Sequence, residues 1–412
     1  MDHHAPAAAR RATPTAGFWI LGATLFTLMV AAAAPSPLYV VYQREWALTP
    51  LELTAVFAVY AVTLLAVLLT AGSLSDHLGR RPVLLAALVL EAGSLGLFLL
   101  AGGVGGLLLA RGLQGVATGA AMATISAGLV DLQPPGRPVL GSLLNAVAPT
   151  AGLAAGALLS GALVEYAPAP TTLVFAVLLA AVALTGAATL VLPEPVRRRP
   201  GALASLRPRV TVPAVARPAF LVAAPAFVAT WAVGGLYLAL GPSLAVGVLG
   251  VRSHLVGGVV VAALTGAGAV GAAATIHRPA RRVMLGGAGA LGLGLVVSLV
   301  ALVEGSLAGF LAGSAVAGLG FGSGFLGGFR TLAGIVDAAR RAELFSAVFV
   351  VSYLAFSLPA LLAGLTVTRY GLRPTALGYG AVVVLLVVSV PVLDRLHRRQ
   401  PTRDVPSALP VR

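Results

Sequence analysis

The chain of 412 residues contains no cysteine and no lysine, and only 10% of its residues are charged. The absence of cysteine excludes disulfides and thiolate metal sites. Soluble domains average about 25% charged residues, because a surface that faces water needs them. A chain with so little charge cannot cover a water-soluble surface of this size. The expected solvent of this protein is therefore the lipid bilayer.

Apolar and small residues dominate what is present: 58% of the residues are hydrophobic and 50 are glycine. Membrane helices attract one another through close backbone packing, so small residues belong at their interfaces. A spanning helix needs about 20 residues, so this length accommodates about twelve spans. Apolar stretches lie at 17–42, 50–75, 82–103, 105–130, 138–163, 171–192, 217–241, 254–276, 283–303, 306–334, 343–366 and 374–393. The sequence predicts an all-α integral membrane protein with twelve transmembrane helices.

The basic residues are distributed unevenly between the two sides of the predicted membrane protein. All 27 are arginine, and they give a net charge of +14. With both termini inside, 21 arginines fall in inside segments, and only Arg44, Arg252, Arg369 and Arg373 fall in outside loops. This is the positive-inside pattern rather than the single basic face of a nucleic-acid-binding protein. We therefore predict cytoplasmic termini and no nucleic-acid partner.

The longest polar interruption, residues 193–217, is rich in proline, glycine and arginine and divides the spans six and six. The predicted organisation is a cytoplasmic tail (1–16), a six-helix bundle (17–192), a mobile cytoplasmic linker (193–217), a second six-helix bundle (218–393) and a cytoplasmic tail (394–412). An offset near 201–203 places Arg80 and Arg81 over Arg281 and Arg282, so the halves look distantly repeated. Alternating-access transporters are built from such repeats.

The loop after the second stretch carries a motif, G-S-L-S-D-H-L-G-R-R, at residues 72–81. It resembles the signature of the major facilitator superfamily, G-x-L-x-D-R-x-G-R-R. The one departure is His77, where arginine or lysine is usual. The resemblance implies a fold of two pseudo-symmetric six-helix bundles and a conformational latch. The residues of that latch would be Gly72, Asp76, Gly79, Arg80 and Arg81.

A physical reason can be given for most of these latch positions. Gly72 would let the helix end approach a neighbouring helix, and Gly79 would permit a tight turn. Asp76 would pair with Arg80 and face a helix N-terminus of the other half, where negative charge is favoured. The alternative is that Arg80 and Arg81 serve only to fix the topology.

A second motif lies in the fourth stretch, where Arg111, Gln114 and Gly115 match the family pattern R-x-x-Q-G-x-G, with Ala117 in place of the last glycine. A charged side chain at mid-membrane costs roughly 2.5–3.5 kcal/mol on insertion, so it is expected to have a function. We predict a coupling or cavity role for these three residues. The alternative is that Arg111 snorkels outward from a helix end.

The fifth stretch resembles a motif of drug–proton antiporters, G-x-x-x-G-P-x-x-G-G. Gly152, Gly156 and Gly161 keep its spacing, but Ala157 replaces the proline and Ser160 replaces one glycine. The three glycines predict a face for close helix packing. Because of the two replacements, the match supports antiport less than a complete motif does.

Glu91 lies near the middle of the third stretch among leucine and valine. Burial favours the neutral form of a carboxyl group, so Glu91 either carries protons or bonds a neighbouring helix. The third helix usually faces lipid in the family, which favours the structural role and makes Arg111 the stronger coupling candidate.

Two further acidic residues are interpreted structurally. Thr49 and Glu52 form a capping-box pattern, and Asp131 is expected to be a solvated loop charge. The substrate-binding candidates come from the helices that line the cavity in this family. They are Tyr60, Asn145, Trp231 and Tyr353.

The sequence contains no P-loop, no metal-ligand cluster and no serine–histidine–acid set, so it predicts no cofactor, no metal and no enzyme activity. The resemblance implies a monomeric secondary transporter in the bacterial cytoplasmic membrane, with a small-molecule substrate. The favoured function is proton-coupled efflux of apolar or amphipathic molecules by alternating access. The alternatives are a facilitator or importer of a neutral metabolite, and a non-transporting membrane sensor or scaffold.

Overall fold

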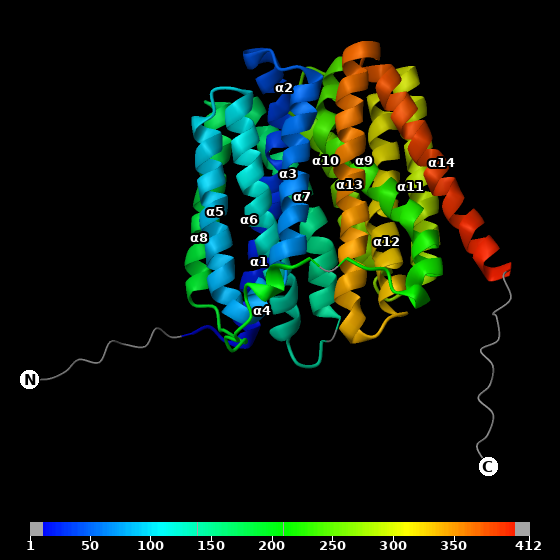
Figure 1. Cartoon of the computed structure of the whole chain (residues 1–412). Coiled ribbons are helices and arrows are strands. Elements are labelled where there is room, and N and C mark those ends of the chain that lie inside the picture. Colours follow the sequence, from blue (N-terminus) through cyan, green and yellow to red (C-terminus); the bar gives the residue numbers. More distant parts are fainter. Residues whose placement is uncertain (1–10, 138, 209, 400–412) are drawn as a thin grey trace, which may run out of the picture.

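The computed structural model describes residues 11–137, 139–208 and 210–399, and the regular elements within these ranges are all helices. Twelve of the helical segments are long and apolar enough to cross a membrane. Figure 1 shows them side by side in one bundle, and the described chain begins and finishes at the same end of it. The prediction of an all-α protein with twelve spans is confirmed.

The helices have the following bounds. The first six spans are α1 (Pro14–Ala33) continued by α2 (Pro35–Trp46), α3 (Pro50–Ala71), α5 (Arg80–Leu100), α6 (Val104–Asp131), α7 (Leu140–Tyr166) and α8 (Pro170–Leu190). The second six are α9 (Arg217–Gly247), α10 (His254–Thr275), α11 (Ala280–Glu304), α12 (Leu307–Ala333), α13 (Ala338–Tyr370) and α14 (Leu372–Arg399). The short α4 (Leu74–Leu78) lies between α3 and α5, and two 3₁₀ turns (Ala204–Leu206 and Ala214–Ala216) lie in the connection between the halves.

Proline and capping residues determine where several helices begin. Thr49 and Glu52 form the predicted capping box at the start of α3, with the Thr49 backbone N–H donating to Glu52 Oε2 over 2.8 Å. The first apolar stretch, expected as one helix, is divided at Ala34. Pro35 has no backbone N–H to donate to the turn before it, so α1 ends and α2 begins there.

Small residues bring neighbouring helices together, as the glycine content predicts. In the pair α11 and α12, a Cβ atom on Gly294 or Gly320 would overlap backbone atoms of the facing helix. The absence of side chains there permits dispersion contacts between backbones, which drive association where lipid surrounds the helices.

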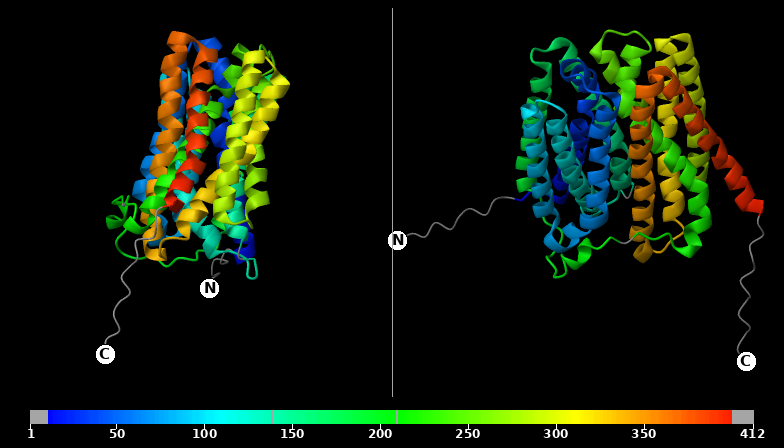
Figure 2. Two further views of the ribbon diagram at one scale, coloured as in Figure 1. Left: turned by 90° about the vertical axis from the view of Figure 1, so that its right-hand side faces the viewer. Right: turned by 45° about the horizontal axis from the view of Figure 1, so that its top comes forward.

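The two halves pack through α7 with α10, α3 with α13, and α2 with α9. We call the end of the bundle away from the described chain ends the outer end, following the predicted topology; the views in Figure 2 show the same arrangement from two further directions. At this end Ser36 Oγ of α2 donates to the Leu238 carbonyl of α9 over 2.5 Å. Glu165 Oε2 of α7 accepts from the His254 backbone N–H at the start of α10 over 2.7 Å. The halves are therefore joined by specific hydrogen bonds at the outer end.

The connection between the halves, predicted as a mobile linker, is bonded to the α4 turn. His77 Nδ1 lies 3.1 Å from the Pro200 carbonyl oxygen, and the Arg199 backbone N–H donates to the His77 carbonyl over 3.0 Å. Ser73 Oγ donates to the Ser205 carbonyl over 3.2 Å. The linker is thus held by hydrogen bonds to backbone groups, which a sequence pattern does not reveal.

The predicted orientation can be tested with single cysteines, because the native chain has none. A cysteine at Ser205, in the linker, should resist an impermeant maleimide applied outside intact cells, whereas one at Ser253, before α10, should react. Permeabilised cells supply the control, since both positions are partly exposed and should then be labelled. Outside labelling at Ser205 would reverse the orientation.

Candidate functional site

A buried polar network connects α6, α5 and α1 in the first half. Arg111 Nη1 donates to the Gln114 Oε1 atom over 2.6 Å and to the Ala32 carbonyl over 3.0 Å. Gln114 Nε2 donates to Glu91 Oε1 over 3.0 Å and to the Ala31 carbonyl over 3.2 Å. Arg111, Gln114 and Glu91, named separately from the sequence, therefore form one hydrogen-bonded set.

The break between α1 and α2 makes carbonyl oxygens available to this network. In a continuous helix the Ala31 carbonyl would accept from the N–H four residues later, but that residue is Pro35. Gln114 takes the place of the missing donor. The kink in the first span and the polar motif of α6 are thus two parts of one arrangement.

Several buried polar atoms of the network have no hydrogen-bond partner in the described part of the chain. They are Glu91 Oε2, Arg111 Nε, Tyr39 Oη and Thr118 Oγ1. The Arg111 guanidinium also lies 4.5 Å from the centre of the Tyr60 ring, a cation–π contact. Buried polar atoms are nearly always bonded in folded proteins, so four such atoms near one another distinguish this region from the rest of the bundle.

The alternative considered for Arg111 is wrong, and so is the expectation that Glu91 lies on a helix that faces lipid. Arg111 does not snorkel, because only 2% of it is exposed and its guanidinium points to carbonyls inside the bundle. Glu91 does not face lipid, because its exposure is 0%. The third span has two faces: Val89 is 70% exposed, whereas Glu91 and Ser94 face α6, where Ser94 Oγ donates to the Ala110 carbonyl.

The predicted latch residues converge at the turn around α4, at the end of the bundle opposite the outer end. Arg80 forms an ion pair with Asp76, donates from Nε to Asp131 Oδ2 over 3.0 Å, and donates from Nη1 to Ser75 Oγ over 2.7 Å. Gly79 has a φ of 100°, which any other residue would adopt only with strain. The last latch residue, Arg81, is bonded through its backbone N–H, which donates to Glu194 Oε2 over 2.9 Å.

Three residues of this turn can be compared with the expectations. Asp131 is exposed, as expected of a solvated charge, but it lies at the end of α6 rather than in a loop and pairs with Arg80. Gly72 does not permit a close approach between helices, because the nearest atom of a neighbouring helix, the Ala123 Cβ, would be 4.0 Å from a Cβ on Gly72. Asp76, whose side chain is 53% exposed, pairs with Arg80 as expected, and no bond from it to the other half is found among the described residues.

The motif glycines of α6 and α7 are packing positions. A Cβ on Gly115 would overlap Thr63 and Tyr60 of α3, and Gly152 and Gly156 lie against the backbone of α1. Gly161 instead lies against α10 in the other half, where a Cβ on this glycine would be 3.1 Å from the His254 carbonyl oxygen. The glycine face of α7 therefore serves both halves.

Three of the four substrate-binding candidates, Tyr60, Trp231 and Tyr353, belong to one apolar cluster between the halves. The Trp231 and Tyr353 rings are 4.7 Å apart, and Phe57 of the first half lies 4.8 Å from Phe356 of the second. Asn145 stands apart, partly exposed on α7 and without a side-chain hydrogen bond among the described residues. The surfaces that the two halves present to each other are therefore aromatic around Phe57 and Trp231.

A family model described as the Major Facilitator Superfamily matches residues 20–279, which is more than half of the chain. The chain belongs to the Major Facilitator Superfamily. It is accordingly a multi-pass membrane transporter with a small-molecule substrate, and the resemblance of the residue 72–81 motif is confirmed. Among curated proteins no match to the sequence was found.

Solved transporter structures share the fold of this superfamily member. A bacterial homologue of the human lysosomal transporter Spinster, in an inward-facing and unoccupied conformation, superposes with a TM-score of 0.69 at 12% identity, covering 93% of this chain and 96% of that one. A mutant of the peptide transporter POT, in complex with alafosfalin, gives a TM-score of 0.71 at 15% identity, covering 93% and 95%. At these identities the likeness shows the fold alone.

Sequence reasoning missed three acidic or phenolic residues that the structure brings to these sites. Tyr39 lies buried beside the polar network, Glu194 accepts from the backbone N–H groups of Arg80 and Arg81, and Glu165 joins the halves. The offset between the two halves could have identified Glu194, because Asp394 lies 200 positions later in the second half. Asp394 pairs with Arg281, and Glu194 bonds the N-terminus of α5 in the corresponding place of the first half.

Proposed function

We propose that this transporter exports small apolar or amphipathic molecules in exchange for protons, and that Glu91 carries the proton. The observation that supports this most is the Glu91 carboxyl group, which is fully buried with one oxygen bonded to Gln114 and the other without a partner among the described residues. A buried carboxyl group that gains and loses a proton changes the charge of its surroundings at each step. Arg111 supplies a fixed positive charge, because a guanidinium keeps its proton.

A path of contacts leads from Glu91 to the outer end. Gln114 bonds both Glu91 and the Ala31 carbonyl at the end of α1. Beyond the break, Ser36 at the start of α2 bonds the Leu238 carbonyl in the other half. Protonation of Glu91 would weaken the charged hydrogen bond to Gln114 and so alter the support of the α1–α2 break. We propose that this couples the proton to outer closure during alternating access.

The proposed substrate class follows from the apolar cluster between the halves. Trp231, Tyr353 and Phe356 offer aromatic faces, and the nearest buried charge, Arg111 of the adjoining polar network, is covered by the Tyr60 ring. Such surfaces favour apolar and amphipathic molecules over highly charged ones. A facilitator or importer of a neutral metabolite would use the same surfaces without a proton step, so coupling decides between them.

The proposal includes the cellular setting and the division of the chain. The two bundles, 17–192 and 218–393, would move as rigid bodies within one monomer in the bacterial cytoplasmic membrane, with both termini cytoplasmic. The arginine distribution supports this orientation. No cofactor or catalytic residue is part of the proposal.

The proposed function is tested in inverted membrane vesicles with the amphipathic dyes ethidium and Hoechst 33342. An imposed pH gradient, acidic inside, should drive dye accumulation in vesicles that contain the protein, and a protonophore should abolish it. Vesicles without the protein are the control. Dye flux that ignores the gradient would indicate a facilitator, and no flux of either dye would contradict the proposed substrate class.

The latch motif gives a separate prediction. Asp76→Asn removes the negative partner of Arg80 while retaining its size, so it should slow dye turnover by about tenfold and leave dye binding unchanged, because it alters a contact that differs between states. Initial rates and equilibrium dye binding in proteoliposomes measure the two effects. Glu343→Gln, another acidic residue at the cytoplasmic end, is the matched control. Wild-type turnover in Asp76→Asn would remove the latch from the account.

A further inference from the structure

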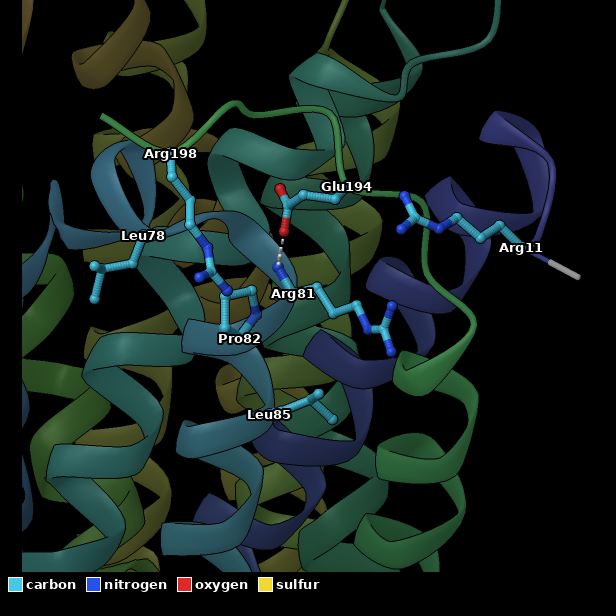
Figure 3. Close-up of a pocket in the computed structure, with 7 residues that line it drawn as sticks. All are labelled: Arg11, Leu78, Arg81, Pro82, Leu85, Glu194 and Arg198. Atoms are coloured by element: carbon cyan, nitrogen blue, oxygen red, sulfur yellow. Dashed lines mark hydrogen bonds between the residues drawn. The ribbon is translucent and has the colours of Figure 1, made fainter. Parts of the chain in front are cut away.

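A cavity of about 330 Å³ lies at the cytoplasmic end of the first half, separate from the polar network and the aromatic cluster. It is lined by Arg11 ahead of α1, Leu78 of α4, Arg81, Pro82 and Leu85 of α5, and Glu194 and Arg198 after α8. Figure 3 shows Arg11 and Arg81 on one side of Glu194 and Arg198 on the other. Three separate parts of the chain thus contribute an arginine to the lining of one cavity.

The charges of this cavity favour an anion. Within the described part of the chain, none of its three arginine side chains forms an ion pair or a hydrogen bond. The single carboxylate, Glu194, is already occupied, because it accepts from the backbone N–H groups of Arg80, Arg81 and Val196. The three guanidinium groups therefore remain available to a ligand, and arginine binds phosphate oxygens well.

The apolar part of the cavity continues onto the membrane-facing side of α5. Pro82 and Leu85 form its wall, and Val89, one further turn along the same face, is 70% exposed. Leu100, at the far end of α5, is exposed as well. A ligand with a phosphate group and long apolar chains would satisfy both the arginines and this exposed stripe.

We propose that the cavity binds the headgroup of an anionic phospholipid of the cytoplasmic leaflet, with its acyl chains along the Pro82–Val89 face of α5. The level of the site agrees with this, because Arg81 is at the start of the α5 span. Anionic lipids are enriched where basic residues lie at the cytoplasmic interface, and each arginine near such a surface strengthens binding by about fivefold. The site does not depend on the substrate or on proton coupling.

The test measures lipid binding by native mass spectrometry of the purified full-length protein in detergent, titrated with phosphatidylglycerol or with phosphatidylcholine of the same chains. The wild type should bind phosphatidylglycerol more tightly. The variant Arg11→Gln/Arg81→Gln/Arg198→Gln should lose roughly 100-fold in affinity, and replacement of the same three residues by lysine should retain most of the binding. Equal binding of both lipids, or equal binding by wild type and the glutamine variant, would overturn the proposal.

A matched control removes the same charge elsewhere. Arg282, Arg340 and Arg395 are exposed near the same end of the second half and form no ion pair among the described residues. Their replacement by glutamine should leave phosphatidylglycerol affinity unchanged; an equal loss would show a general charge effect and contradict a specific site. If the triple variant fails to fold, Arg11→Gln/Arg198→Gln, which changes residues outside helices, should lose about 25-fold.

Two soluble probes identify the source of the phosphate group. Inorganic phosphate and glycerophosphoglycerol, the headgroup without acyl chains, should compete poorly with phosphatidylglycerol, because neither contacts the exposed face of α5. Poor competition supports a lipid site. If either probe displaces the lipid at equal concentration, the cavity is a site for soluble phosphate compounds and the lipid proposal is wrong.

Discussion

Arg111→Ala is expected to abolish proton-driven dye accumulation. The substitution removes the hydrogen bonds to Gln114 and to the Ala32 carbonyl, together with the positive charge that faces Glu91 through Gln114. Removal of one partner from a buried charged network costs about 3 kcal/mol of folding stability, so each variant must be shown to be folded before its transport is compared. We expect the initial rate of uphill transport in proteoliposomes with an imposed pH gradient to fall to the level of liposomes without the protein.

The control for this prediction is Arg111→Lys, which retains the charge but not the paired geometry of a guanidinium. It should recover part of the uphill transport, and protein yield and melting temperature show whether each variant is folded. Full transport by Arg111→Ala would remove Arg111 from the coupling mechanism. If substitutions at both Arg111 and Glu91 leave uphill transport intact, neither residue takes part in coupling and the proposed proton site is wrong.

Gly258→Leu should hold the transporter open at its outer end. Gly258 of α10 lies against the Ala157 carbonyl of α7, and a Cβ atom there would overlap that oxygen. Overpacking of this kind costs about 1–3 kcal/mol, which would shift the equilibrium away from outer closure by roughly 5- to 150-fold. The contact joins the two halves, so the strain is relieved when the halves separate.

Outer opening is measurable without a substrate. Ala157→Cys places a thiol on the residue whose carbonyl oxygen faces Gly258, in a chain that has no other cysteine, and Ala157 is fully buried. Its labelling by an impermeant maleimide from outside should be slow alone and at least about fivefold faster with Gly258→Leu. Gly286→Leu, at an open position of α11, is the matched control and should change nothing. Unchanged labelling with Gly258→Leu would show that this contact does not close the outer end.

The fold can be predicted because hydropathy and charge are properties of whole segments and do not depend on single contacts. The lack of charge identifies the membrane, and the arginine distribution and the residue 72–81 motif indicate the family. The division of the first span depends on Pro35, whose missing N–H interrupts the helix and exposes the Ala31 carbonyl. The sequence does not show that Gln114 donates to this carbonyl, because residue spacing does not determine which side chain of another helix lies beside it.

The sequence identifies the residues of the polar network but not the hydrogen bonds that join them. Arg111, Gln114 and Glu91 each stand out as polar residues in apolar helices, yet the sequence presents Arg111 and Glu91 as rivals for one role. The rotation of α5, which turns Glu91 toward α6, depends on packing against two neighbouring helices. The Glu194 interaction escapes sequence reasoning because its partners are backbone N–H groups, which have no signature in the sequence.

The most direct test of the central claim compares two transport modes of Glu91→Gln in proteoliposomes. Glutamine keeps the shape of the side chain and a group for bonding Gln114, but it cannot carry a proton. We predict that ethidium exchange without a gradient persists and no longer varies with pH, whereas uphill accumulation driven by a pH gradient is lost. Uphill accumulation at the wild-type level in Glu91→Gln would contradict the claim that Glu91 carries the coupled proton.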